Sequence, residues 1–240
     1  MMPESLRTLL TNLVDYAGLY PPAALPFPEV IANYERYLLS PEAWMLNRLV
    51  LPMEKLGELV CGEKWRVTLL VEGEPGPLPP QVETLETKSG KRLSLPTYCE
   101  VPLDRVDDGY AKVRTGGLTA DATPPLETLA DFLCGAAARH LPFKATAGLH
   151  HPIRSNMHGF LNVFVAATFA WLEVQKPQII AVLNESDPQS FEFRDDGLRW
   201  RDWSASTAEV EQARRNFAHS FGSCSFEEPV NDLRQLGLLK

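Results

Sequence analysis

The feature that most constrains this fold is a series of short apolar segments separated by proline-rich junctions. Twenty prolines occur among the 240 residues, and many cluster at junctions such as YPPAALPFP, GEPGPLPP and HLPF. Because proline ends helices and central strands, these junctions divide the chain into many short elements. Several segments are continuously apolar, as is typical of strands covered on both faces. Eight strands are predicted, at residues 12–18, 47–52, 65–73, 81–87, 97–102, 110–117, 142–148 and 178–185.

Helices are predicted between some of these strands, at residues 27–40, 124–140 and 158–175. Thr123 is placed to cap the second of them, because its hydroxyl can accept from a free amide and proline follows at the first helical position. Helices that alternate with eight strands favour an α/β fold, a (β/α)8 TIM-like barrel, as a single domain over residues 1–240.

The middle of this barrel is predicted to be irregular. The connections at 72–80 and 87–96 are shorter than a parallel crossover with a full helix requires, so either helices are missing there or the sheet is partly antiparallel. The DDG sequence between alternating apolar residues predicts a hairpin insertion at 190–202, after the eighth strand. Ser206 with Glu209, and Ser225 with Glu228, fit the capping box and predict a C-terminal helical cap over 206–240.

Composition and charge indicate which kinds of molecule this chain is expected to bind. A formal net charge of −8 argues against nucleic acid as a partner. With no bilayer-length apolar run and no signal sequence, we expect a cytoplasmic protein with no membrane partner. Cys61, Cys99, Cys134 and Cys224 are too widely spaced for a zinc or redox pair. No Walker or Rossmann pattern is present, so no cofactor is predicted and the expected partner is a small-molecule substrate; the oligomeric state is left open.

Two of the predicted strands carry a lysine between small or apolar residues. Lys112 lies in AKVRTGG and Lys144 in FKATAG. Side chains alternate along a strand, so Lys112, Arg114 and Gly116 share one face, as do Lys144 and Gly148. If the apolar faces contact the helices, the three cations point into the barrel lumen from adjacent strands.

Buried cations require compensation. An unpaired one costs several kcal/mol, so carboxylates are expected nearby, with Asp15, Glu72 and Glu100 as the candidates on other strands. A close like charge and burial both lower a lysine pKa. A partly neutral lysine can attack a carbonyl and form an imine. Either lysine alone is also explained as a solvated or salt-bridged surface residue; the matched pair favours a functional site.

The segments AKVRTGG and FKATAG resemble the sixth and seventh strands of the deoxyribose-phosphate aldolase family, which carry K-T-S-T-G-like and K-A-S-G-G-like sequences. The resemblance covers residues 110–150 and implies a class I aldolase barrel. It also implies that Lys112 forms a Schiff base and that Lys144 lowers its pKa. Arg114 stands where that family has a small residue. The family's catalytic aspartates have no clear counterpart in this sequence, and Glu100 is the nearest candidate acid/base. In DYAGLYPPA and KATAGLHHP the whole chain also resembles an uncharacterised bacterial family, which implies no activity.

Residues for anion binding are predicted at the strand ends. Gly116, Gly117 and Gly148 lack side chains and let backbone amides approach an anionic group, although glycines at strand ends also serve simply as turns. Arg114 and Arg154 are candidates to clamp the anion.

The first predicted strand ends near the same mouth. Asp15 and Tyr16 are candidates for substrate binding there. Tyr20 follows on a Pro-Pro loop, which either covers the mouth or packs against the rim of the barrel.

Histidines and a cysteine offer further chemistry. His150 is a candidate general acid/base. It could instead form a metal site with His158 and a carboxylate, or simply bond to the loop backbone; no metal is assigned. Cys224 could act as a nucleophile only with a base nearby, and His219, expected on a helix five residues earlier, is the candidate base. The alternative is that Cys224 is a buried structural thiol.

These residues lead to three hypotheses. In the first, a barrel enzyme acts on a small anionic carbonyl compound by an aldolase- or lyase-like reaction through a Lys112 imine, with Lys144 and Arg114 as neighbouring cations and Glu100 or His150 moving protons. In the second, the three cations clamp an oxyanion, and the same acid/base residues perform isomerase or lyase chemistry without an imine. The third is a non-catalytic scaffold whose cations are neutralised internally.

Overall fold

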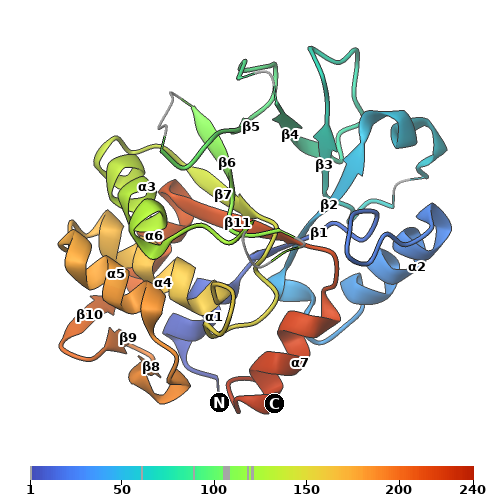
Figure 1. Cartoon of the computed structure of the whole chain (residues 1–240). Helices are drawn as coiled ribbons and strands as arrows, with labels where there is room; N and C mark the ends of the chain where they lie inside the picture. Colours follow the sequence, from blue (N-terminus) through green and yellow to red (C-terminus); the bar gives the residue numbers. More distant parts are fainter. Residues whose placement is uncertain (1, 61, 89, 105–108, 118, 120–121) are drawn as a thin grey trace.

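Eight parallel strands close into a barrel in the computed structural model, which describes residues 2–60, 62–88, 90–104, 109–117, 119 and 122–240 (Figure 1). The strand order around the barrel is β1-β11-β7-β6-β5-β4-β3-β2. The predicted (β/α)8 fold class is therefore confirmed. The barrel strands are β1 Val14–Tyr16, β2 Leu46–Pro52, β3 Val67–Leu70, β4 Val82–Thr87, β5 Thr97–Glu100, β6 Tyr110–Arg114, β7 Phe143–Thr146 and β11 Ala218–Ser223.

Helices cover the barrel unevenly. In Figure 1, α3, α4 and α5 gather on the side of β6, β7 and β11, while the side of β3, β4 and β5 carries loops. No helix lies between β3 and β4 or between β4 and β5 in the described residues, yet every pair there is parallel. The alternative of a partly antiparallel barrel sheet is thus wrong. The helices are α1 Glu4–Leu10, α2 Phe27–Leu38, α3 Leu126–Ala138, α4 Phe160–Trp171, α5 Lys176–Asn184, α6 Thr207–Asn216 and α7 Glu227–Gln235.

The predicted eighth strand at 178–185 is wrong, because this segment lies within and just after helix α5. A short apolar run does not distinguish a buried strand from a buried helix, and Pro177 near the start of α5 suits a first helical turn. The eighth strand is instead β11, whose residues alternate between the helices and the lumen. The predicted helical cap over 206–240 therefore contains a barrel strand between α6 and α7.

The segment where a hairpin insertion is predicted, at 190–202, lies in a small antiparallel sheet that is separate from the barrel. Strands β8 Phe191–Phe193, β9 Gly197–Trp200 and β10 Trp203–Ser206 pair in the order β10-β9-β8. This sheet precedes the eighth barrel strand rather than following it. Among the described residues, no helix has the length and apolar character needed to cross a membrane.

Two of the three predicted helix caps are altered in the structure. Ser206 and Glu209 form the full capping box of α6. Ser225 accepts a hydrogen bond from the Glu228 amide at 3.1 Å, but the Glu228 carboxylate bonds to His150 instead of completing a box. Thr123 does not cap α3, which begins at Leu126 after Pro125.

The barrel wall separates apolar from polar side chains. Between the wall and helices α3 and α4, Phe143 packs against Phe217 at 5.0 Å between ring centroids, and Phe160 stacks on Phe221 at 5.2 Å. The lumen side instead carries buried polar and charged residues. They are Asp15, Thr68, Thr84, Glu86, Lys112, Lys144 and Ser220. The alternation expected from the sequence thus delivers charged groups to the inside of the barrel.

Gly148→Ala tests the close approach of the β6 and β7 strand ends. Gly148 has a φ of +87°, and a Cβ there would lie 2.6 Å from Gly116 Cα. We expect this variant to lose about 2–4 kcal/mol of unfolding free energy from strain and overpacking.

The matched control is Gly222→Ala, since a Cβ at that position meets only Thr146 Oγ1 at 3.6 Å. We expect it to change the stability by less than about 1 kcal/mol. Urea unfolding measures both variants, and equal losses would contradict the packing described.

Candidate active site

Lys112 and Lys144 lie side by side in the barrel lumen. The two residues are register partners on the neighbouring parallel strands β6 and β7. Lys112 is 9% exposed and Lys144 is 1% exposed. Both side chains point inward because they alternate with the apolar positions Val113, Phe143 and Ala145, which are fully buried on the helix side.

A single carboxylate joins the two amines. Glu86 on β4 accepts from Lys144 Nζ through Oε1 at 2.5 Å, and its Oε2 lies 2.8 Å from Lys112 Nζ. Glu100 on β5 approaches Lys112 at 3.4 Å and Arg114 at 3.8 Å. Lys112 therefore lies between two carboxylates, one fully buried and one nearer to solvent.

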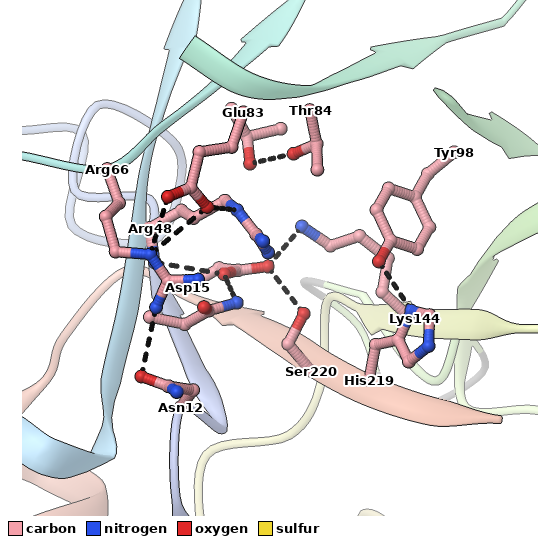
Figure 2. Close-up of polar contacts among 12 residues, drawn as sticks. Asn12, Asp15, Arg48, Arg66, Glu83, Thr84, Tyr98, Lys144, His219 and Ser220 are labelled. Atoms are coloured by element: carbon pink, nitrogen blue, oxygen red, sulfur yellow. Dashed lines mark hydrogen bonds and ion pairs between the residues drawn. The ribbon is translucent and has the colours of Figure 1, made fainter. Parts of the chain in front are cut away.

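A second carboxylate holds Lys144 from below, as Figure 2 shows. Asp15 Oδ2 accepts from Lys144 Nζ at 2.5 Å and from Ser220 Oγ at 2.7 Å. Asp15 Oδ1 accepts from Asn47 Nδ2 at 2.6 Å and from the Arg48 amide at 3.2 Å. With both oxygens occupied, Asp15 is a fixed structural anion rather than a substrate contact.

These ion pairs set the protonation states. Burial alone would raise the pKa of Asp15, but Lys144 and Arg48 outweigh it and hold that pKa below its usual value. The pKa of Glu86 is lowered in the same way, since Lys144 and Lys112 outweigh burial. Burial alone would lower the pKa of Lys144, but Asp15 and Glu86 raise it above its ordinary value. The expected downward shift is therefore wrong for Lys144, which stays a cation.

A pocket of about 300 Å³ opens at the carboxyl ends of the strands, above the lysines. Its lining includes Lys112, Lys144, Glu86 and Glu100 at the barrel end, with Lys88 and Arg114 as further cations. Other lining residues are Tyr20, Pro21, Pro22, Thr146, Gly117, Gly148, His150, Gly222 and Cys224. This is the end of the barrel where the fold class places its active sites.

Two of the predicted anion-binding residues do not line this pocket. Gly116 packs against Gly148 at the strand ends and is not part of the lining. Arg154 lies outside as well, where its guanidinium is 3.2 Å from His158 Nδ1. Arg114 does line the pocket, with a side chain that is 58% exposed and lies 3.8 Å from Glu100.

Tyr16 also lies away from the pocket, because it alternates with Asp15 on β1 and points toward the helices. Its ring packs edge-on against Tyr37 at 5.2 Å, and its hydroxyl accepts from Asn33. Tyr20 lines the pocket instead. Its buried hydroxyl has no hydrogen-bond partner among the described residues. Burial, followed by the charges of Glu86 and Glu54, raises the pKa of Tyr20, which keeps the hydroxyl protonated.

Glu86 is the functional residue that sequence reasoning missed. Glu72, one of the acids expected to balance the lysines, is exposed, and Glu86 takes that role. The signal was present in QVETLET, where Thr84 and Glu86 occupy alternate positions on the lumen face while Leu85 faces outward.

The hypothesised metal site and nucleophilic pair are not formed. His158 is buried, with Nε2 bonded to the Pro124 carbonyl, and does not line the pocket with His150. No group of three or more His, Cys, Asp or Glu side chains is placed to hold a metal within the described ranges. His219 lies on β11 rather than on a helix; its Nδ1 bonds to Tyr98, and it does not line the pocket with Cys224. Burial raises the pKa of the Cys224 thiol; Cys61 lies outside the described residues.

Comparisons of the chain with family models, curated proteins and solved structures gave no significant match. The chemistry of the pocket is therefore the basis for a functional assignment.

Glu86→Gln tests the shared carboxylate. Removing one partner from a buried ion pair typically costs about 3–5 kcal/mol, and we expect a loss of that size in unfolding free energy. Glu83→Gln is the matched control, because Glu83 on the same strand pairs with Arg48 and Arg66 at a half-exposed position where pairs contribute about 1 kcal/mol or less. Urea unfolding compares the two, and similar losses would refute a special role for Glu86.

The pH dependence of stability follows from the same network. Asp15 and Glu86 have lowered pKa values in the folded chain, so their contribution is complete above the unfolded values of about 4 and is lost as the pH falls below them. Lys144 has a raised pKa, so its contribution is complete below about 10.4 and is lost at higher pH.

Urea midpoints measured from pH 2 to pH 11 should therefore fall at both ends. Salt screens exposed charges far more than buried ones, so the acid loss should persist at about 1 M salt. Its disappearance in salt would show that surface charges cause it.

Proposed function

We propose that this barrel is an enzyme that acts on a small anionic carbonyl compound through an imine on Lys112, in an aldolase- or lyase-like reaction. The observation that carries the proposal is the position of the Lys112 amine at an open pocket, between Glu86 and Glu100, beside a second lysine that stays charged.

Charge balance supports this chemistry. Lys112 must first release a proton, and Glu100, at 3.4 Å and on the solvent side, is placed to receive it. The neutral amine then adds to the carbonyl carbon, and Glu100 returns the proton as water leaves, which gives a protonated imine. The imine carries the same single positive charge as the ammonium group that it replaces, so Glu86 stabilises it without rearrangement.

The pocket lining supports an anionic substrate. Four cations line it, Lys88, Lys112, Arg114 and Lys144, against the two carboxylates Glu86 and Glu100. The exposed Arg114 is suited to a carboxylate or phosphate at the rim. A volume of about 300 Å³ suits a small metabolite, and the Tyr20 hydroxyl offers a hydrogen bond to one of its oxygens.

The local resemblance to the deoxyribose-phosphate aldolase family supports the same roles. Segments 110–117 and 142–148, which carry it, correspond to β6 and β7. In that family the first lysine forms the imine and the second modulates it, which matches Lys112 and Lys144. Arg114 departs from the family pattern, and its exposed side chain suggests that the difference concerns the anionic end of the substrate.

A second candidate is favoured by the engagement of both amines with carboxylates. In that alternative Lys112, Arg114 and Lys144 remain charged and stabilise an oxyanion, while Glu100 and His150 transfer protons. A non-catalytic scaffold is less favoured, because an open pocket lies above the ion pairs.

Borohydride trapping distinguishes these candidates. Incubation with acetaldehyde, glyceraldehyde or pyruvate followed by reduction should leave a mass adduct on the peptide that contains Lys112. Lys112→Arg retains the charge but cannot form the imine, so it should abolish the adduct. Lys88→Arg, at the pocket rim, is the control and should leave the adduct in place.

If Lys112→Arg keeps the wild-type adduct level, or if no carbonyl in the panel labels Lys112, the imine proposal is wrong. The oxyanion and scaffold alternatives would then remain.

A further inference from the structure

Two adjacent histidines after β7 are each bonded to a carboxylate on α7. His150 Nδ1 lies 3.0 Å from Glu228 Oε2, and His151 Nδ1 lies 2.6 Å from Asp232 Oδ2. Glu228 and Asp232 are four residues apart and so share one face of the helix. Helix α7 therefore holds the loop that follows β7, the strand that carries Lys144.

The two pairs differ in what the imidazole faces. His150 lines the pocket, and its side chain is 20% exposed. The His151 side chain is 54% exposed and does not line the pocket. The His151–Asp232 pair thus has the same kind of contact as the His150–Glu228 pair but lies outside the pocket. It therefore serves as a control for substitutions in the His150–Glu228 pair.

Helix α7, which carries Glu228, is anchored to the rest of the chain by ion pairs at both ends and by buried apolar residues. Its first residue, Glu227, pairs with Arg36 on α2, and Arg234 near its end pairs with Glu42 at 2.5 Å. Val230 and Leu233 are buried beneath it. Contacts at both ends of α7 and its buried face therefore hold the helix that carries Glu228.

A carboxylate on Nδ1 defines the tautomer of a neutral imidazole. Nδ1–H donates to Glu228, which leaves the lone pair on Nε2. No hydrogen bond joins Nε2 to the described residues. Glu100, the other acid/base candidate, is engaged by Lys112 and Arg114, so His150 is the freer base in the pocket.

We propose that His150 removes the proton from the carbon next to the Lys112 imine, and that Glu228 is its positioning residue. This inference rests on the proposed function and extends it to the step after imine formation. It assigns the substrate class as carbonyl compounds with a hydrogen on the carbon adjacent to the carbonyl.

The step balances in atoms and electrons. His150 Nε2 takes the proton, the electrons of the C–H bond form a C=C bond, and the C=N electrons move to nitrogen to give an enamine. In an addition, the enamine carbon bonds to an aldehyde carbon, and the imidazolium returns its proton to the aldehyde oxygen. Water then hydrolyses the imine and frees Lys112.

Hydrogen–deuterium exchange isolates this step from imine formation. In D₂O, the methyl groups of acetaldehyde and pyruvate should exchange in the presence of wild-type protein, as followed by proton NMR. His150→Gln should slow the exchange by about 10²–10⁴-fold, the usual contribution of a general base. It should still give the borohydride adduct on Lys112.

Glu228→Gln should slow the exchange by a smaller factor, while Asp232→Asn and His151→Gln should leave it unchanged. Nitrogen-15 NMR of the histidines supplies a readout independent of activity. His150 should carry its proton on Nδ1 in the wild type and lose that preference in Glu228→Gln, but not in Asp232→Asn.

An adduct on Lys112 with undiminished exchange in His150→Gln would overturn this inference and leave the imine intact. A wild-type His150 with its proton on Nε2 would overturn the role of Glu228, even if the variants fail to fold. The absence of any adduct on wild-type Lys112 would instead overturn the proposed function, and this inference with it.

Discussion

The carboxylate of Glu86, shared by two buried ammonium groups, is the interaction on which the rest of the site depends. A lone buried ion costs several kcal/mol, and two like charges on adjacent strands cost more. Glu86 offers one oxygen to each amine, and Asp15 balances Lys144 from the opposite side. The barrel can therefore carry two lysines in its lumen and still present one of them to a pocket.

The lysines and two of the carboxylates that balance them come from different sides of the unevenly covered barrel. The strands that supply the lysines, β6 and β7, are followed by α3 and α4, which pack an aromatic core against the wall. The strands that supply Glu86 and Glu100 lie on the side without helices in the described residues (Figure 1). The cations are thus held on the helix-covered side, and the Tyr20 loop and the His150 loop, which contacts α7, line the pocket.

Much of this arrangement could be predicted from alternation alone. Because the period of a strand is two residues, a lysine between outward-facing apolar residues must point into the lumen, and register follows once the strands are adjacent. The same rule places Glu86 inside and Tyr16 outside, but it requires the phase of each strand. Val82 and Leu85 are three positions apart and so do not define that phase for β4. The eighth strand could not be found, since AHSFGS carries little apolar signal whereas the helix α5 is strongly apolar. The α7 contacts join residues about 80 positions apart, a pairing that no local pattern predicts.

The shared ion pair can be observed directly by carbon-13 and nitrogen-15 NMR of the lysine side chains as the pH is raised. Ordinary lysines lose their proton near pH 10.4. Lys144 should remain protonated beyond that point, with ammonium protons that exchange slowly enough with solvent to give a cross-peak. A Lys144 signal that titrates together with the exposed lysines, and shows no protected ammonium, would contradict the buried network from which the whole account is built.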